Sequence, residues 1–183
     1  MAEGVYTFKI GLFDCAVVSD GMAMLMPDAA KILMANAPEA ELVTALQAHG
    51  ISGYDIPYRM NCLYVRTDQH RVLVDTGLGG GVHPDLGQLI NNLSAINVTP
   101  AAVDTLIITH GHGDHIGGLT DASGQLVFPN ARYFMRKPEW EFWTAEESLA
   151  KMDDFGKGFA TKNLPPLASK INLITHLTRD EIN

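Results

Sequence analysis

Three histidines and one aspartate lie within six consecutive positions of the chain: His110, His112, Asp114 and His115. Neutral imidazole and carboxylate oxygen are the usual non-thiolate ligands of zinc, and iron, manganese or cobalt also use them. Residues at i and i+2 of an extended chain point to the same side, so His110 and His112 can hold one ion together. Asp114 and His115 follow one turn later and more naturally hold a second ion, about 3.5 to 4 Å from the first. The spacing predicts a two-metal site, with Asp114 as the candidate catalytic carboxylate.

Chance clustering is the alternative explanation for this motif. With the histidine and aspartate content of this chain, a His-x-His-x-Asp-His pattern arises by chance about once in a thousand such sequences. The other histidines have no comparable neighbours, and we expect each to be structural or exposed to solvent: His49, His70, His83 and His176. The metal site is therefore expected at the cluster alone.

Two other kinds of site could use residues of this sequence. A single-metal oxygenase would use His110, His112 and Asp114 as two histidines and one carboxylate, but it leaves His115 and the glycines at 117–118 unexplained. The glycines at 77–81 suggest a phosphate-binding loop, but no Gly-Lys-Ser/Thr sequence follows them and the spacing is not that of a dinucleotide loop. The two-metal interpretation is the stronger one.

Hydrophobic periodicity predicts the elements that position this cluster. The pattern predicts that Leu106–Ile108 is a short buried strand that leads directly into His110. The other expected strands are two within 6–19, a hairpin of 61–67 and 71–75, a pair at 126–128 and 132–135, and a last strand at 171–175. Helices are expected from Pro38 to Gly50, through 86–93, in a short turn at 99–100 and at 138–143, whereas 151–166 is weakly patterned.

Composition narrows the class of protein. The chain has 183 residues, 46% of them hydrophobic, which suits one compact domain over 1–183. A net charge of −8 argues against nucleic acid or an anionic membrane as the partner and favours a small neutral substrate. No segment approaches the length of a membrane span and the start lacks a signal-peptide pattern, so we expect a cytoplasmic protein. Cys15 and Cys62 are expected to be buried reduced thiols, and the methionines of 22–26 to fill core space.

The motif, completed by Gly117-Gly118, resembles the signature of the metallo-β-lactamase superfamily. The chain also has a VLVDTG strand at 72–77, VVSDG at 17–21, FPNARY at 128–133 and a Glu-Trp-x-Phe-Trp helix at 139–143. This combination is similar to the branch that contains methyl parathion hydrolase and the N-acyl homoserine lactone lactonases. The resemblance implies an α+β protein with the metallo-β-lactamase fold, an αβ/βα sandwich, of which residues 1–183 supply mainly the N-terminal αβ half.

The resemblance also implies roles for individual residues. His110 and His112 would hold the first metal and Asp114 and His115 the second, with Asp75 bracing the histidine loop from behind. A hydroxide bridging two zinc ions would then attack an ester, lactone, amide or phosphotriester. Trp140 and Trp143 are equally consistent with a wall of the substrate pocket and with core aromatics.

The family pattern is incomplete in this sequence. A full site needs a third histidine on the first metal, a carboxylate that bridges both ions and a last histidine on the second. Only 68 residues (183 − 115) follow His115, and their single histidine, His176, has no neighbouring glycine motif. We therefore expect a C-terminally truncated domain with an exposed sheet face, which a homodimer or a missing partner segment would cover. The alternative function is a catalytically incomplete remnant that binds metal as a structural or interaction module.

Overall fold

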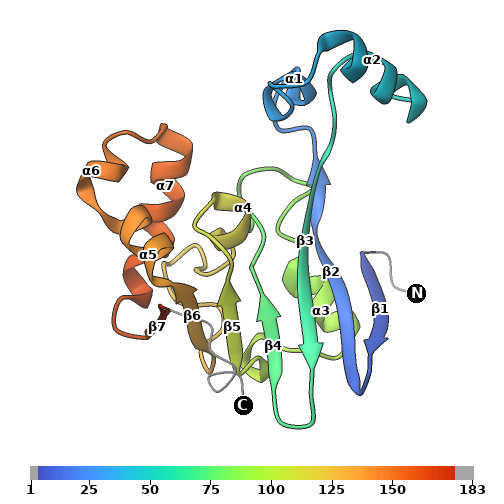
Figure 1. Cartoon of the computed structure of the whole chain (residues 1–183). Helices are drawn as coiled ribbons and strands as arrows, with labels where there is room; N and C mark the ends of the chain where they lie inside the picture. Colours follow the sequence, from blue (N-terminus) through green and yellow to red (C-terminus); the bar gives the residue numbers. More distant parts are fainter. Residues whose placement is uncertain (1–3, 176–183) are drawn as a thin grey trace. The chain divides into compact units, whose positions relative to one another are not determined.

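The computed structural model describes residues 4–175, which form a mixed α+β structure (Figure 1). The strands are β1 (Val5–Ile10), β2 (Phe13–Ala23), β3 (Tyr58–Arg66), β4 (Arg71–Val74), β5 (Thr105–Ile108), β6 (Arg132–Arg136) and β7 (Ile171–Ile174). The helices are α1 (Ala29–Leu33), α2 (Glu39–Ala48), α3 (Leu89–Ala95), α4 (Gly113–Ile116), α5 (Lys137–Thr144), α6 (Glu146–Leu149) and α7 (Asp154–Asn163), with 3-10 turns at Pro100–Ala102 and Pro165–Leu167.

The seven strands form one sheet in the order of the sequence, β1 to β7. β1 and β2 are antiparallel, as are β3 and β4, whereas β4, β5, β6 and β7 run parallel to one another. Parallel neighbours need crossover connections, and the segments between them carry the helices α3 to α7. Because β4 and β5 are parallel neighbours, the loops that follow Val74 and Ile108 leave the sheet at the same edge. This edge carries the histidine cluster.

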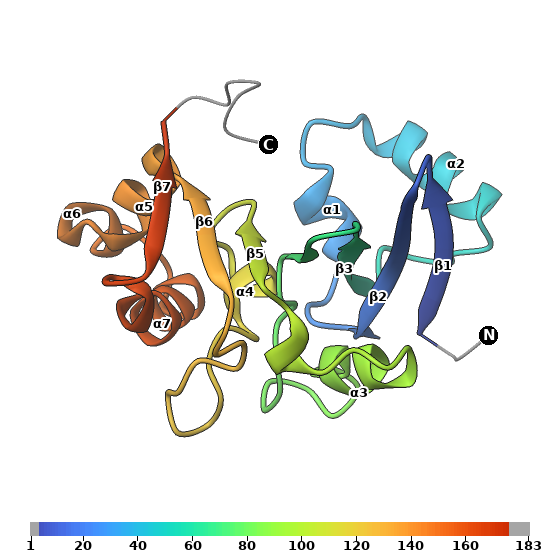
Figure 2. The ribbon, with the colours of Figure 1, turned by 90° about the horizontal axis from the view of Figure 1, so that it is seen from below.

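The main hydrophobic core lies between the sheet and the helices α3 and α7, which lie on the same side of it (Figure 2). Leu73, Leu106 and Tyr133, from three adjacent parallel strands, are fully buried in this core. The alternate residues of these strands face the other way, and Ile107 there is 36% exposed. Whether another chain or segment covers this second face stays a prediction.

The chain divides into two compact units, each with its own packing. One contains the chain up to Gly21 and from Met60 onward, and it holds the main core and the histidine cluster. The other, Met22–Arg59, contains α1 and α2 around a small cluster of Ala30, Leu42 and Leu46. The boundaries of a single domain over 1–183 remain a prediction.

Several expected elements differ from those observed. The expected strand at 126–128 is wrong, because Leu126 forms only an isolated bridge with Thr120. The weakly patterned segment contains the ten-residue helix α7, whose start is capped by Asp153 accepting from the Gly156 amide. Met22 and Met24 are 41% and 52% exposed, so the expectation that they fill core space is wrong.

Other expectations agree with the structure. Cys15 and Cys62 are both buried and free. Within residues 4–175, no helix combines the length and the apolar character that crossing a bilayer requires.

Candidate metal centre

The histidine cluster lies where β5 ends and the short helix α4 begins. The chain leaves the sheet after Ile108, and His110 and His112 occupy the connecting loop, with His112 as the extended residue just before α4. Asp114 and His115 lie within α4 and are half-buried. The strand therefore fixes the start of the loop, and the helix fixes the last two candidate ligands.

Asp75 lies directly behind this loop, at the end of β4. Its φ angle is +62°, in the left-handed region that few residues other than glycine adopt, although aspartate tolerates it better than most. Its Oδ2 atom accepts from His115 Nδ1 at 2.8 Å, and its Oδ1 atom accepts from the Thr109 amide at 2.8 Å. In the neutral ring, a proton on Nδ1 that is donated to this carboxylate leaves His115 Nε2 without a proton and able to bind a metal ion.

Thr109 extends this contact to a second histidine. Its hydroxyl donates to Asp75 Oδ2 at 2.8 Å, and the same oxygen lies 3.0 Å from His110 Nδ1. Because the hydroxyl proton is directed to Asp75, the Thr109 oxygen is free to accept from His110 Nδ1–H. One buried carboxylate thus orients two imidazoles, one from each of the predicted ligand pairs.

The donor atoms of Asp114 and His115 fit a zinc ion. Asp114 Oδ2 and His115 Nε2 lie 3.3 Å apart. Two nitrogen or oxygen ligands of one tetrahedral zinc ion are separated by about 3.3 Å, given their usual bond lengths. This pair therefore has the chemistry and the spacing of two ligands of one ion.

The charges of the cluster suit a cation. Burial opposes the charged form of His115, but its hydrogen bonds to Asp114 and Asp75 outweigh burial and raise its pKa to about 9. The hydrogen bond to His115 lowers the pKa of Asp114. Burial, followed by the charges of His115 and His112, lowers the pKa of His110. Without a metal ion, the proton on His115 is the positive charge that the two carboxylates stabilise.

His110 is the ring that links the two predicted pairs. Its centroid lies 4.9 Å from that of His112, in an edge-on arrangement, and 3.9 Å from that of His115. Across residues 4–175, however, no three His, Cys, Asp or Glu side chains are placed to hold one metal ion together. The described residues bring the candidate donors together as pairs, and their role as metal ligands stays a prediction.

A tryptophan also supports the loop, through its contact with His112. Trp143 is buried in the main core, and its ring packs edge-on against His112 with 5.0 Å between centroids. Glu139 Oε2 accepts from Trp143 Nε1 at 3.0 Å and from the Gly111 amide at 3.3 Å. Trp140 is only partly buried, at the margin of the same core. A pocket-wall role for the two tryptophans stays a prediction.

Glycines let the loop pack this closely. A Cβ atom at Gly111 would lie 2.3 Å from Trp143 Cγ, and one at Gly117 would lie 2.1 Å from the carbonyl oxygen of Leu78. Neither approach is possible for a residue with a side chain unless its neighbour moves. The glycines of the motif therefore let the histidine loop pack closely against the core and against the loop that follows β4.

Substituting Gly111 with alanine is expected to lower the free energy of unfolding by about 1 to 3 kcal/mol, because the new methyl group must displace the Trp143 ring. Chemical denaturation monitored by tryptophan fluorescence measures this change. Gly158→Ala is the control, since a Cβ at Gly158 meets no atom within 4 Å and alanine favours the helix. Equal stability of Gly111→Ala and the unaltered protein would contradict the packing described.

The remaining histidines of the described residues lie outside the cluster. His49 ends α2 and is exposed, His70 Nδ1 contacts Asp104 Oδ1 at 3.2 Å, and His83 Nδ1 accepts from the Asp85 amide. His176 lies outside the described residues. Sequence reasoning missed Thr109 and Glu139 as supports of the loop, because nothing in the local sequence shows which distant groups they contact.

Comparisons with known proteins identify the family of this chain. The family model of the metallo-beta-lactamase superfamily matches residues 56–166, more than half of the chain. Among curated proteins, exodeoxyribonuclease WalJ of Streptococcus pneumoniae serotype 2 is 30% identical over 100 residues, which cover 53% of this chain and 33% of that protein.

Two solved structures share the fold. The dizinc quorum-quenching lactonase AidC aligns with a TM-score of 0.75 and 24% identity, over 97% of this chain and 64% of its own. The hydrolase AbOPH of the beta-lactamase superfamily aligns with a TM-score of 0.82 and 21% identity, over 96% of this chain and 62% of its own. The chain thus spans about a third of its curated relative and under two thirds of these structures.

Proposed function

Because the chain belongs to the metallo-beta-lactamase superfamily, we propose that it is a metal-dependent hydrolase acting on a small ester, lactone or phosphotriester. We propose zinc as the metal, with two ions in a complete site. Iron, manganese and cobalt use the same donor types. The similarity to a structure described as a dizinc lactonase supports this choice of metal and substrate class.

The observation that carries the proposal is the geometry at the start of α4. Asp114 Oδ2 and His115 Nε2 are 3.3 Å apart, and the opposite nitrogen of His115 is held by Asp75 at 2.8 Å. A surface ion pair does not need a buried carboxylate behind its histidine, whereas a metal-ligating histidine almost always donates its other ring N–H to a carboxylate, a backbone carbonyl or water. The arrangement favours metal binding over a chance cluster.

The chain's own residues would orient the site and keep it rigid. His110 and His112 would hold one ion, Asp114 and His115 the other, and Asp75 would fix the imidazole tautomers. Bound ions would supply Lewis acidity and an activated water nucleophile. The buried Trp143 would keep His112 in place through ring packing.

The charge of the chain bears on the substrate. A net charge of −8 repels polyanions, so we propose a small neutral substrate rather than the nucleic acid that the name of the exodeoxyribonuclease relative implies. A chromogenic ester, a lactone and a neutral phosphotriester represent the three proposed classes.

The second candidate function is a metal-binding module without catalytic activity. The observation in its favour is that residues 4–175 contain no group of three or more donors placed to hold a metal ion, whereas catalytic zinc usually has three protein ligands. Ions held by two ligands are weakly bound, so this module would bind metal with low affinity and turn over no substrate.

Elemental analysis and turnover measured on the same preparation separate the two functions. The proposal expects two zinc ions per chain and hydrolysis of at least one of the three substrates. Metal binding without turnover would favour the module, and less than one ion per chain without turnover would rule out the hydrolase. The variant with both His110→Ala and His112→Ala is expected to lose metal and activity. His49→Ala, an exposed histidine of the other unit, is the control that should change neither.

A further inference from the structure

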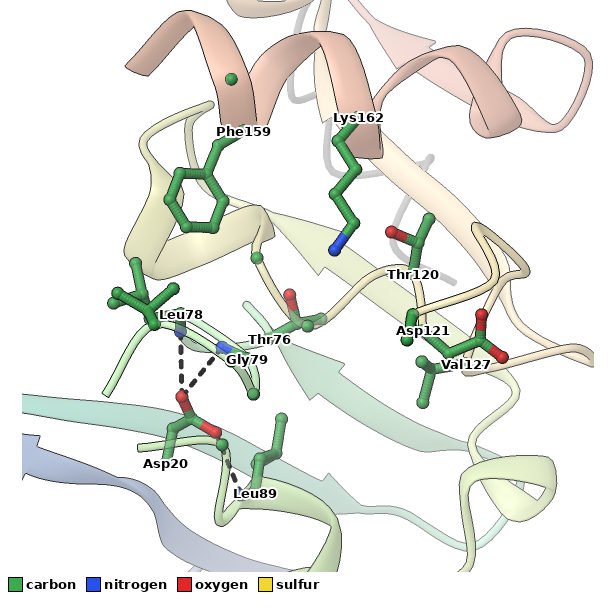
Figure 3. A pocket seen from close by; sticks show the side chains of 18 of the residues that line it. Asp20, Thr76, Leu78, Gly79, Leu89, Thr120, Asp121, Val127, Phe159 and Lys162 are labelled. Carbon is green, nitrogen blue, oxygen red and sulfur yellow. Dashed lines mark hydrogen bonds between the residues drawn. The ribbon is translucent and has the colours of Figure 1, made fainter. Parts of the chain in front are cut away.

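A cavity of about 850 Å³ lies between α3, α7 and the glycine-rich loop that follows β4 (Figure 3). All of its lining residues belong to the larger unit of the chain. In the described part of the molecule, none of the four candidate metal ligands contributes to its wall. Its volume lies in the range of sites that bind small organic molecules. It is therefore a space separate from the candidate metal centre that a ligand could occupy.

The walls of this cavity are largely apolar. Leu78 and Leu89 are buried against it, whereas Ile90, Val127 and Phe159 are half-buried and leave part of their surface open to it. Such walls favour an aliphatic or aromatic body over a polar one, because filling the space removes apolar surface from water.

The carboxylates near the cavity are already engaged or lie at its rim. Asp20 accepts from the amides of Leu78, Gly79 and Leu89, as Figure 3 shows. Asp121 Oδ1 accepts from the amides of its own turn. Asp154, in the first turn of α7, is exposed. These groups offer little to a ligand inside the cavity.

Lys162 is the cation of the cavity. Its side chain extends from α7 toward the space between Thr76 and Thr120 (Figure 3). The ion pairs among residues 4–175 engage other cations: Lys9, Lys31, Arg66, Lys137 and Lys151, besides histidines. Lys162 is exposed like Asp154, but Figure 3 shows that its side chain points into the cavity, so its ammonium group can pair with an anion that enters there.

A helix glycine lies on the wall of the cavity. Gly158 lies inside α7 and lines the cavity, and a Cβ atom added to it would meet no atom within 4 Å. Glycine is among the least favourable residues in a helix interior, and here neither packing nor backbone geometry requires it. A larger residue at this exposed position would therefore place its side chain on the wall of the cavity.

We propose that this cavity binds a small amphipathic carboxylate, with its apolar body against Leu78, Leu89 and Phe159 and its carboxylate paired with Lys162. The apolar walls favour an apolar body for the ligand, and the ammonium group of Lys162, which forms no ion pair within residues 4–175, favours a negative charge on it. The proposal does not depend on the metal centre or on the hydrolase function.

Decanoate is the probe that tests the proposal, titrated into the full chain by calorimetry. The expected result is saturable binding of one decanoate per chain, with much weaker binding of acetate, which lacks the apolar body, and of decyltrimethylammonium, which carries the opposite charge. Lys162→Met should lower the affinity about tenfold by removing a charge-assisted hydrogen bond. Gly158→Leu should weaken binding by placing a side chain in the space that the ligand would occupy.

Two controls separate lost binding from lost structure. Lys157→Met changes a lysine of the same helix that does not line the cavity, and it should leave the affinity unchanged. Gly158→Leu should raise the melting temperature, because leucine favours the helix. The proposal is overturned if decanoate does not saturate, if neither cavity variant weakens its binding, or if decyltrimethylammonium binds as well as decanoate.

Discussion

Replacing Asp20 with alanine is expected to lower the free energy of unfolding by about 3 kcal/mol or more, because it leaves buried amides without an acceptor. Asp20 is fully buried at the end of β2. Its Oδ2 atom accepts from the amides of Leu78 and Gly79 at 2.9 and 3.1 Å, and its Oδ1 atom accepts from the Leu89 amide at 3.1 Å. One carboxylate thus joins a strand, the glycine-rich loop and the start of α3.

Chemical denaturation measures the effect of Asp20→Ala. Asp20→Asn should fall between alanine and aspartate, since its amide oxygen can still accept from Leu78 and Gly79 while its NH2 group would face the Leu89 amide. If the alanine variant does not fold, the loss of stability is measured on Asp20→Asn instead.

Asp121→Ala is the matched control for Asp20. Asp121 also accepts from two backbone amides, those of Ser123 and Gln125, but in an exposed turn where water can replace it. Its loss should cost less than about 1 kcal/mol. Equal effects at Asp20 and Asp121 would show that burial of the Asp20 carboxylate contributes little to the fold.

Much of the sheet could be predicted because its pattern is local. Leu106–Ile108 is a buried run next to the motif, and the hairpin of β3 and β4 has two apolar runs with a polar turn between them. The helix α7 could not be predicted in this way. Its buried residues are Ala160 and Asn163, and its two phenylalanines stand among glycines and charged residues. Its apolar face is therefore too narrow to be recognised in the sequence.

The candidate site divides in the same way between local and distant residues. His110, His112, Asp114 and His115 are recognisable because they lie within one loop and one helix turn. Asp75 could be inferred only from the family resemblance, since it lies 40 positions before the histidine that it contacts. The contacts of Asp20 with a loop 58 positions later depend on the three-dimensional packing of β2 against that loop. No spacing in the sequence indicates them.

Replacing Asp75 with asparagine is expected to weaken zinc binding about 10- to 100-fold without unfolding the protein. The asparagine oxygen can keep the contact with the Thr109 amide, and asparagine tolerates the left-handed φ of +62° at this position. Its NH2 group would then face His115 Nδ1, which must become the acceptor. The proton of His115 moves to Nε2, the nitrogen that a metal ion needs.

Competition with a chromogenic chelator measures the zinc affinity, and the nitrogen chemical shifts of the imidazole rings report the tautomer. Asp104→Asn is the matched control, because Asp104 Oδ1 lies 3.2 Å from His70 Nδ1 in an exposed pair at the start of β5, the opposite end of that strand from the histidine loop. It should change the His70 environment and leave the zinc affinity unaltered. Unchanged zinc affinity in Asp75→Asn, with the His115 tautomer reversed, would mean that His115 is not a ligand. A loss of zinc affinity with an intact fold would instead show that metal binding depends on Asp75. This carboxylate orients His115 directly and His110 through Thr109.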